Sequence, residues 1–539
     1  MLLISKLQGG RHPTLTSFFS VKYLAFFLPA AILFYAVMPK KWKKYALLLE
    51  SLGFFWLISG QHIAWLLVSI VSVWGCGLWL GRLLERRDAA VKAAEKPQRK
   101  AIKQKYLGYT RLVLALAALG NLGILLVLKY SGFFIRNVNV VFGLEFSVPA
   151  YVMPIGISFY TLQAISYVFD VYQGTVKADR NLLRVALFLC FFPQIVEGPI
   201  CRYGQTADQL WNAEPIRFDN LTQGLQRIGY GFMKKLVVAD RLNMFVEGVF
   251  GEYRAYEGGV IALAAVCYTI QLYMDFSGAM DAVTGTAQIF GVTMPENFKR
   301  PFFSRTISEF WTRWHVTLGT FFKDYIFYPV TMSKPMKKLT GAARKKLGNH
   351  FGPLVAGGIA LFCVWFCNGV WHGAAWSFLF FGMYHFALIL GGSLIAPAVK
   401  KLNERIGFSP EKPVCHLVQV LRTCVLVVIG ELFFRADGLR AGLFMFVRMV
   451  TNFRFSSING ELLKALSIDG KDFLIVGVTV VIVFIVSLLN EKGICVRKAL
   501  AEKPLPVRWA VLYALILYII IFGAYGVGYV PVDPMYANF

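Results

Sequence analysis

Histidine is the side chain best suited to acid–base chemistry near neutral pH. One of the seven histidines in this chain, His372, lies in the segment Asn368-Gly-Val-Trp-His-Gly-Ala-Ala-Trp376, between two apolar runs. The flanking glycines allow a helix break and a close approach of the backbone, and the tryptophans can wall an apolar pocket. An imidazole in such a pocket would favour its neutral form, which can accept a proton from a hydroxyl. A packing or helix-capping histidine explains this segment equally well.

Two other histidines lie among apolar residues. His315 occurs in Glu309-Phe-Trp-Thr-Arg-Trp-His-Val-Thr-Leu318, where Trp311 shares its helix face at i,i+4. This pattern alone favours a helix in the aromatic belt of a membrane over a catalytic role. His385, inside an apolar run, is best explained by a hydrogen bond to a neighbouring helix. The other four histidines are expected at interfaces: His12, His62, His350 and His416.

Two carboxylates end another apolar run, in Gln271-Leu-Tyr-Met-Asp-Phe-Ser-Gly-Ala-Met-Asp281. Asp275 and Asp281 are six residues apart and would point to different faces of a straight helix, so we do not predict a catalytic carboxylate pair. Each is expected to orient a neighbouring donor, such as a histidine or tyrosine. The chain contains no Gly-x-Ser-x-Gly elbow, P-loop or dinucleotide fingerprint, so a serine hydrolase or ATPase has no support.

The elements that must position these residues are transmembrane helices. Hydrophobic residues make up 57% of the chain, and runs such as Phe473–Leu489 and Val511–Val527 carry no charge. We predict an all-α polytopic membrane protein with roughly 11–14 transmembrane helices, plus re-entrant or interfacial helices around a central channel. The candidate spans are 21–38, 45–60, 62–81, 112–131, 148–170, 183–196, 257–276, 352–370, 375–396, 414–434, 473–489 and 509–528.

The segments 217–250 and 300–330 differ from these spans, because they mix charges with aromatic residues at helical spacing. Such segments suit interfacial or re-entrant helices, which are tolerated at depth only when buried in protein or lining a cavity. No internal repeat or low-complexity linker is evident. The sequence therefore predicts a single membrane domain over 1–539, with N-terminal helices at 17–131, a core at about 150–390 and further helices at 414–528.

The net charge of +26 lies mainly in short loops between apolar runs. This distribution is typical of the cytoplasmic side of a bilayer protein, so we do not predict nucleic-acid binding; the remaining charge would face anionic lipid or acidic partners. The basic loops that fall on one side are 40–44, 82–105, 334–346, 399–412 and 492–508. This predicts a multi-pass protein of the plasma membrane with both termini extracellular. Val21–Met38 is read as a retained first helix rather than a cleaved signal.

The nine cysteines fall mostly inside apolar runs and are expected to be small packing residues. Cys363 and Cys367 are one helical turn apart, but no second Cys/His pair completes a ligand set. We predict no metal site.

A family resemblance rests on five segments. They are Pro154-Ile-Gly-Ile-Ser-Phe-Tyr160, Phe191-Phe-Pro-Gln-Ile-Val-Glu-Gly-Pro199, Tyr273-Met-Asp-Phe-Ser-Gly278, Pro295-Glu-Asn-Phe298, and the pair Phe310–Tyr328 with Asn368–Trp376. The combination of Arg-Trp-His with Gly-x-Trp-His-Gly, separated by a span, is specific. Together they resemble the bacterial branch of the membrane-bound O-acyltransferases, which includes the alginate O-acetyltransferase membrane subunit and the D-alanyl transferase of teichoic acids.

The resemblance implies roles for particular residues. His372 takes the position of the family's catalytic histidine, deep in a channel through the protein, and His315 that of a second histidine on the cytoplasmic side. Asp324 and Asn368 match positions near these histidines. The candidate supporting residues are Asp324, Asn368, Asp275, Trp371 and Tyr273.

The implied reaction moves an acyl group from a cytoplasmic donor to a hydroxyl on an extracellular acceptor. No tightly bound cofactor is expected, because a donor such as acetyl-CoA or an acyl-carrier protein would be a substrate. An extracellular acyltransferase is a further candidate partner. The chain length and the extra helices after about residue 410 favour acetylation of an exported polysaccharide over D-alanylation or another acyl transfer.

Two other classes stay open on sequence alone. A transporter or flippase would also show many spans and buried ionisable residues, but it should show symmetry between halves, which is not evident here. A scaffold for an extracellular transferase predicts that both histidines are dispensable. Transfer of label from an acyl donor to an acceptor distinguishes an enzyme from both.

Overall fold

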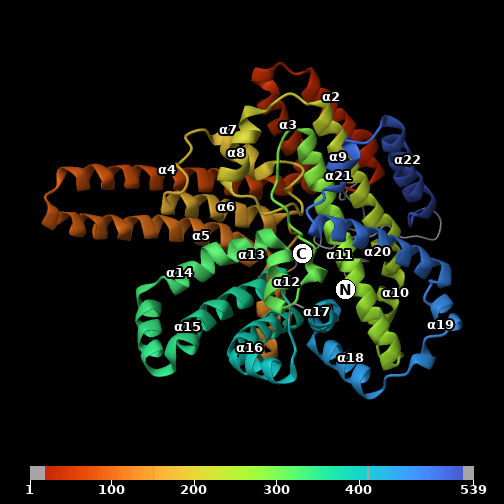
Figure 1. Ribbon diagram of the computed structural model, residues 1–539. Coiled ribbons are helices and arrows are strands. Elements are labelled where there is room, and N and C mark those ends of the chain that lie inside the picture. Colours follow the sequence, from red (N-terminus) through yellow and green to blue (C-terminus); the bar gives the residue numbers. More distant parts are fainter. Residues whose placement is uncertain (1–17, 150, 410–411, 526–539) are drawn as a thin grey trace. The chain divides into compact units, whose positions relative to one another are not determined.

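The computed structural model describes residues 18–149, 151–409 and 412–525, which form helices and connecting loops without a strand (Figure 1). These residues form two compact units. The first contains 18–149, 151–228 and 282–294, and the second contains 229–281, 295–409 and 412–525. The prediction of an all-α protein is confirmed. The predicted positions of the two termini fall on residues outside the described ranges.

Helical segments long and apolar enough to cross a membrane number eight within the described residues. They are Lys40–Ala93 (α3, Lys40–Ser59, and α4, Ile63–Ala93), α5 (Lys96–Phe142), α11 (Gly258–Ile289), α15 (Lys334–His372), α16 (Trp376–Ile406), α17 (Pro413–Arg435), α20 (Gly470–Glu491) and α22 (Leu505–Phe522). A shorter apolar helical stretch covers Tyr23–Val37. The protein is therefore a multi-pass membrane protein, as predicted.

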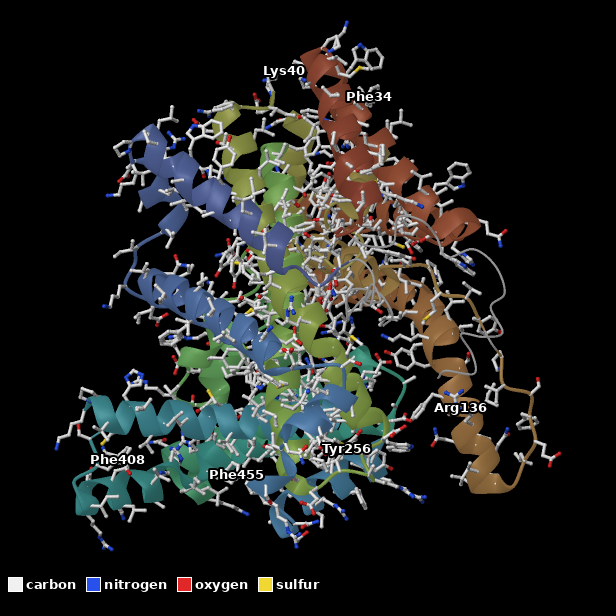
Figure 2. All side chains as sticks on the ribbon, turned by 90° about the vertical axis from the view of Figure 1, so that its right-hand side faces the viewer. Phe34, Lys40, Arg136, Tyr256, Phe408 and Phe455 are labelled. Carbon is white, nitrogen blue, oxygen red and sulfur yellow. The ribbon has the colours of Figure 1, made fainter. Side chains whose placement is uncertain are left out.

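Large apolar side chains are exposed on this protein to an extent that a water-soluble surface would not tolerate. Phe455 is 78% exposed and Phe34 is also exposed; Figure 2 labels both residues. On α22 no residue of the apolar stretch is buried, and Ile521 is 66% exposed. Contiguous apolar surface of this kind is expected where helices face lipid.

Two predicted spans fold as shorter helices. The span at 148–170 is represented by α6 (Ile157–Gln173) and that at 183–196 by α7 (Leu182–Cys190). Helix α7 ends before Phe191-Phe-Pro193, because a residue preceding proline is driven out of the helical conformation. The chain beyond it turns back into the first unit, where Gly156 (φ 77°) leaves no room for a side chain, since a Cβ there would lie 1.9 Å from the carbonyl oxygen of Ile195.

The first unit is organised around a long antiparallel hairpin of α4 and α5, against which α6 packs (Figure 1). Its aromatic core includes Phe192, whose ring centroid lies 5.9 Å from that of Phe54 and 5.5 Å from that of Phe290. The backbone N–H of Phe192 donates to the hydroxyl of Ser51 at 3.2 Å. These buried contacts fix the chain after α7 against α3.

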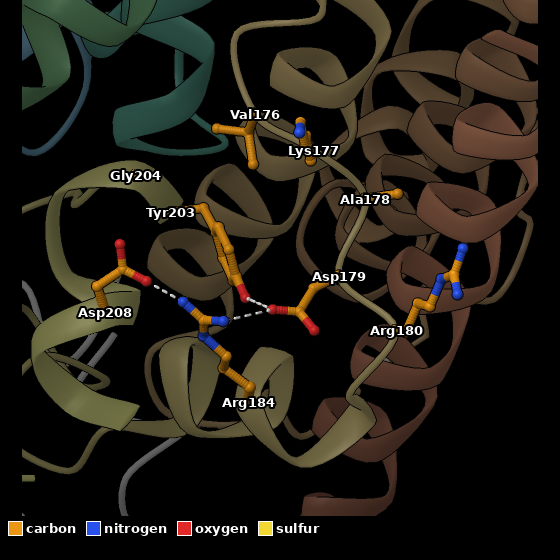
Figure 3. Close-up of a pocket in the computed structure, with 9 residues that line it drawn as sticks. All are labelled: Val176, Lys177, Ala178, Asp179, Arg180, Arg184, Tyr203, Gly204 and Asp208. Atoms are coloured by element: carbon orange, nitrogen blue, oxygen red, sulfur yellow. Dashed lines mark hydrogen bonds and ion pairs between the residues drawn. The ribbon is translucent and has the colours of Figure 1, made fainter. Parts of the chain in front are cut away.

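A polar pocket of 390 Å³ in the first unit lies beside the loop between α6 and α7 (Figure 3). The Tyr203 hydroxyl, from α8 (Tyr203–Asn212), donates to Asp179 at 2.5 Å. Arg184 pairs with Asp179 at 3.3 Å and also with Asp208. Since Arg184 bonds two carboxylates, these contacts hold the loop between α6 and α7 against α7 and α8.

The segments predicted as interfacial or re-entrant fold as runs of short helices. Those of 217–250 are α9 (Phe218–Phe232), the π-helix η3 (Met233–Ala239) and α10 (Asp240–Gly251). Those of 300–330 are η4 (Pro301–Phe303), α12 (Ile307–Arg313), α13 (Val316–Phe322), the π-helix η5 (Lys323–Phe327) and α14 (Tyr328–Thr331). Later short helices are α18 (Leu439–Thr451), α19 (Gly460–Ala465) and α21 (Val496–Ala501). Single π turns inside helices often occur at functional sites.

Helices α15 and α16 form a tight hairpin in the second unit. A Cβ on Gly369 would lie 2.6 Å from the carbonyl oxygen of Phe378, and one on Gly382 would lie 2.4 Å from that of Trp365. Small residues on both helices thus let the backbones approach closely, as is common between membrane helices. Helix α15 changes direction at Gly348 (φ 78°) and ends at His372.

Candidate functional site

His315 is held in an unusual backbone conformation by a network of hydrogen bonds. It is the residue before α13, with φ 45° and ψ 50° in the left-handed region. Its Nδ1 lies 3.1 Å from Oδ1 of Asn297, which also accepts from the backbone N–H of Thr317 at 3.1 Å and from its hydroxyl at 2.9 Å. A left-handed histidine costs backbone energy, and such strain persists only where the surroundings enforce it.

The network determines which nitrogen of His315 carries the proton. The backbone N–H of Thr317 can only donate, so the Asn297 atom that it meets is the carbonyl oxygen. An oxygen in this position accepts, and Nδ1 of His315 therefore donates. In the neutral imidazole this leaves the lone pair on Nε2, the atom that can accept a proton or a hydrogen bond from a substrate.

Burial keeps His315 neutral. The side chain is 3% exposed, and its ring centroid lies 4.8 Å from that of Phe276 and 5.7 Å from that of Trp371. Loss of hydration on burial lowers the pKa of His315 to about 3, because the charged form of the imidazole is disfavoured in an apolar site. The side chain is a base of fixed tautomer in an apolar site.

His372 is the last residue of α15, where the backbone of Gly373 extends and the helix stops. It is 4% exposed, and its ring centroid lies 5.0 Å from those of Trp371 and Phe434. Gly373 packs closely here, since a Cβ at this position would lie 2.3 Å from the Phe378 ring and would force that ring to move. His372 is therefore buried among aromatic side chains.

Trp371 connects the two histidines, because its indole contacts the ring of His315 and the ring of His372. Asn368 lies one turn before His372 on the same helix and is 6% exposed. Its Oδ1 has no hydrogen-bond partner among the described residues. A buried acceptor without a partner is rare in proteins, and here it could receive a hydrogen bond from a substrate.

The remaining predicted residues support this region in different ways. Tyr273 packs its ring against Phe302 at 5.2 Å and Trp314 at 5.9 Å, so it belongs to the aromatic wall beside His315. Asp324 lies half-buried in η5, eight residues after Val316, the first residue of α13.

Asp275 and Asp281 pair with buried lysines of η3. Lys235, 1% exposed, lies 2.7 Å from Asp275 and 2.8 Å from Asp240. Lys234 lies 2.5 Å from Asp281. The sequence suggested histidine or tyrosine donors for these carboxylates, whereas the structure supplies ammonium groups, so that the buried charges compensate one another.

His385 makes the hydrogen bond to a neighbouring helix that its sequence context suggested. Its Nδ1 accepts from Nε1–H of Trp311 in α12 at 3.2 Å, and the side chain is fully buried. Among the described residues, no group of three or more His, Cys, Asp or Glu side chains could hold a metal ion.

Sequence reasoning assigned no role to Asn297, although it organises the His315 network. The only signal was its place in Pro295-Glu-Asn-Phe298, one of the segments on which the family resemblance rests. The site therefore contains three buried polar groups among aromatic rings. They are the neutral imidazole of His315 with its known tautomer, the imidazole of His372, and the amide oxygen of Asn368, which is available to accept a hydrogen bond. This set suits the removal of a proton from a hydroxyl in a water-poor environment.

Comparisons with known proteins agree with this chemistry. The model of the MBOAT, membrane-bound O-acyltransferase family, matches residues 176–344, which include His315. The probable alginate O-acetylase AlgI of Pseudomonas syringae pv. tomato is 30% identical over 84% of this chain and 79% of its own length.

Two other relatives act on different polymers by name. The peptidoglycan O-acetyltransferase of Helicobacter pylori is 27% identical over 85% of this chain and 81% of its own. The teichoic acid D-alanyltransferase of Bacillus subtilis is 28% identical over 51% of this chain and 67% of its own. With its multi-pass helical fold, its paired histidines and this extent of similarity, the chain belongs to the membrane-bound O-acyltransferase family and is an O-acyltransferase.

Proposed function

We propose that this protein takes an acetyl group from a cytoplasmic donor and moves it across the membrane for O-acylation of an exported cell-surface polysaccharide. The observation that carries the proposal is the pair of buried imidazoles against Trp371, one of them a neutral base with Nε2 as acceptor. The O-acetyltransferase relatives align over more than four-fifths of the chain, while the D-alanyltransferase aligns over about half. This difference in extent favours acetyl over D-alanyl as the acyl group.

In the proposed reaction His372 accepts the proton of the acceptor hydroxyl as its oxygen attacks the carbonyl carbon of an acetyl thioester. The new C–O bond forms, the C–S bond breaks, and the proton on His372 passes to the departing sulfur. His315 offers its Nε2 lone pair to an N–H or O–H of the donor and so positions the thioester. Asn368 would receive the hydroxyl or amide hydrogen of a bound substrate through its buried Oδ1.

The proposed donor is an anionic molecule such as acetyl-CoA or an acyl-carrier protein. Helix α15 carries exposed basic residues in its first turns and His372 at its other end. This cluster, named here the α15 basic cluster, consists of Lys337, Lys338, Arg344, Lys345 and Lys346. A cluster of positive charges raises the local concentration of an anionic ligand and its rate of association.

The proposed orientation places the basic loops in the cytoplasm and both termini outside. His372 then lies toward the outer end of α15, since the basic residues lie at the opposite end of that helix. An extracellular acyltransferase that receives the acetyl group is a proposed partner.

The test uses purified protein in liposomes with radiolabelled acetyl-CoA on the side of the basic loops. The proposal expects label on a polysaccharide acceptor, or on an added extracellular transferase, at the other side. D-alanyl carrier protein should give no transfer in the same assay. Transfer of D-alanine alone would replace the acetyl proposal, and movement of a small molecule without any covalent transfer would favour a transporter.

A further inference from the structure

The outer part of the α4–α5 hairpin encloses a cleft that the proposed reaction does not use. It has a volume of 840 Å³ and lies wholly within the first unit. Helix α4 contributes Leu84 and Arg87, α5 contributes residues between Lys96 and Thr110, and α6 contributes Tyr172. We name it the hairpin cleft; Figure 1 shows the two helices that form it. Its volume lies within the ~300–1,000 Å³ typical of small-molecule sites.

The cleft is strongly cationic. On α5 the four basic residues of its lining lie within eight positions and share one helix face, because each has another of the four three or four residues away: Lys96, Arg99, Lys100 and Lys103. Arg87 faces them from α4, and the carboxylate in the lining, Asp88, pairs with Arg87 at 2.8 Å. Within the described ranges no carboxylate lies within ion-pair distance of the three lysines. Like charges at this spacing repel, so an anion in the cleft would stabilise the hairpin.

The polarity of the cleft changes along its length. Helix α4 is uncharged from Ile63 to Gly81, and α5 is uncharged from Leu112 to Leu128. Leu84, Leu107 and Tyr172 line the end of the cleft that adjoins these uncharged stretches, and tyrosine is enriched where a membrane meets water. The lysines lie at the other end, near the turn of the hairpin.

This arrangement places the cations nearest the uncharged stretches, Arg87 and Lys103, close to the level of lipid headgroups. At ~1.5 Å per residue, Arg87 lies about 9 Å beyond Gly81 and Lys103 about 14 Å beyond Leu112 along their helix axes. Long basic side chains extend back toward the membrane, and the headgroup layer begins where the hydrocarbon ends. Basic pockets between transmembrane helices are a known means of binding anionic headgroups.

We propose that the hairpin cleft binds the phosphate headgroup of an anionic phospholipid, whose acyl chains lie along the uncharged stretches of α4 and α5. A water-soluble anion would use the lysines but would gain nothing from the apolar end that opens toward the bilayer. A phospholipid uses both ends, because its charge and its chains are separated along the same direction as those of the cleft.

The test measures lipid retention by native mass spectrometry, with cardiolipin, phosphatidylglycerol or phosphatidylcholine added to protein in detergent. The variant Lys96→Gln/Lys100→Gln/Lys103→Gln removes three charges from the cleft. Its matched control, Lys400→Gln/Lys401→Gln/Arg405→Gln, removes three exposed charges from the end of α16. The variant Lys96→Arg/Lys100→Arg/Lys103→Arg keeps the cleft charge.

We expect wild type, the control and the arginine variant to retain the anionic lipids, and the glutamine variant of the cleft to bind them at least tenfold more weakly. Phosphatidylcholine should be retained by none. Equal retention by the cleft variant and wild type, or an equal loss in the control, would overturn the proposal. So would cleft-dependent binding of inorganic pyrophosphate or acetyl-CoA without cleft-dependent binding of lipid. Because the substituted lysines are exposed, the unfolding temperatures of all variants should match that of wild type.

Discussion

The Nδ1 atom of His315 donates to Oδ1 of Asn297 across 3.1 Å, and this bond fixes the tautomer of a buried base. The segment 295–299, which contains Asn297, also contacts α13 through its backbone, since the N–H of Val316 donates to the carbonyl oxygen of Asn297 at 2.9 Å. The backbone N–H of Lys299 also donates to the carbonyl oxygen of Arg313 at 2.8 Å. The segment 295–299 therefore fixes the conformation and the tautomer of His315 before any substrate binds.

Replacing Asn297 should disturb catalysis more than packing. In Asn297→Ala, His315 and Thr317 lose their shared acceptor, which should cost ~1–3 kcal/mol of folding stability and release the tautomer of the imidazole. Acyl transfer should fall at least tenfold, while Asn297→Asp, which keeps the acceptor, should retain more activity with a shifted pH profile. Transfer assays and thermal unfolding of both variants check this. Full activity in Asn297→Ala would show that the preset tautomer is unimportant.

The buried state of His315 predicts how stability depends on pH. Its pKa is lowered from the ordinary 6.5 to about 3, so between these values the unfolded chain binds a proton that the folded protein does not. Stability should therefore fall as the pH drops from about 6.5, and no effect of this residue is expected above pH 7.5.

The measurement compares the thermal unfolding of wild type with that of His315→Gln from pH 8 to pH 4. The wild-type protein should lose stability relative to the variant by on the order of a few kcal/mol over this range. Subtracting the two curves removes the other titrating groups that they share. Parallel curves at every pH would contradict a buried, uncharged His315.

Sequence patterns were most informative where the physics is local. Uncharged apolar runs located the long spans, and glycines around His372 indicated the tight turn that α15 and α16 form. The role of Asn297 could not be predicted from local sequence patterns, because its hydrogen bond to His315 joins residues 18 positions apart. The lysine partners of Asp275 and Asp281 could not be predicted either, because η3 and α11 are distant in sequence and come together only on folding.

The shortness of α7 was also missed, although its cause is in the sequence. Hydropathy treated 183–196 as one apolar run, whereas Pro193 stops the helix at Cys190. The family resemblance, rather than residue spacing, singled out His315 among the histidines, because its surroundings alone suggested an aromatic belt.

Membrane orientation can be tested with single cysteines in a cysteine-free background. Glu95→Cys lies at the turn between α4 and α5, and Thr340→Cys lies in the α15 basic cluster segment. An impermeant thiol reagent should label neither on intact cells and should label both after permeabilisation, because loops rich in Lys and Arg stay in the cytoplasm. Labelling of either position on intact cells would reverse the proposed topology.

The α15 basic cluster should attract the donor electrostatically. Changing its five cations to glutamine should raise the apparent KM for acetyl-CoA several-fold at low salt and leave kcat nearly unchanged. The difference from wild type should shrink at high ionic strength, where the ~3–10 Å Debye length screens exposed charges. Lys400→Gln/Lys401→Gln/Arg405→Gln serves as the control, with an expected wild-type KM. An unchanged KM in the cluster variant at low salt would exclude donor docking there.

The most direct test of the proposed mechanism is acyl transfer per mole of inserted protein by His372→Gln and His372→Ala. Both variants should lose about 10²–10⁴-fold in rate, because neither side chain can take up the hydroxyl proton. His416→Gln, at an exposed histidine, is the matched control and should transfer at the wild-type rate. Elution as a single species and an unchanged unfolding temperature would show that the variants are folded. Wild-type turnover by folded His372→Gln and His372→Ala would contradict the assignment of His372 as the catalytic base.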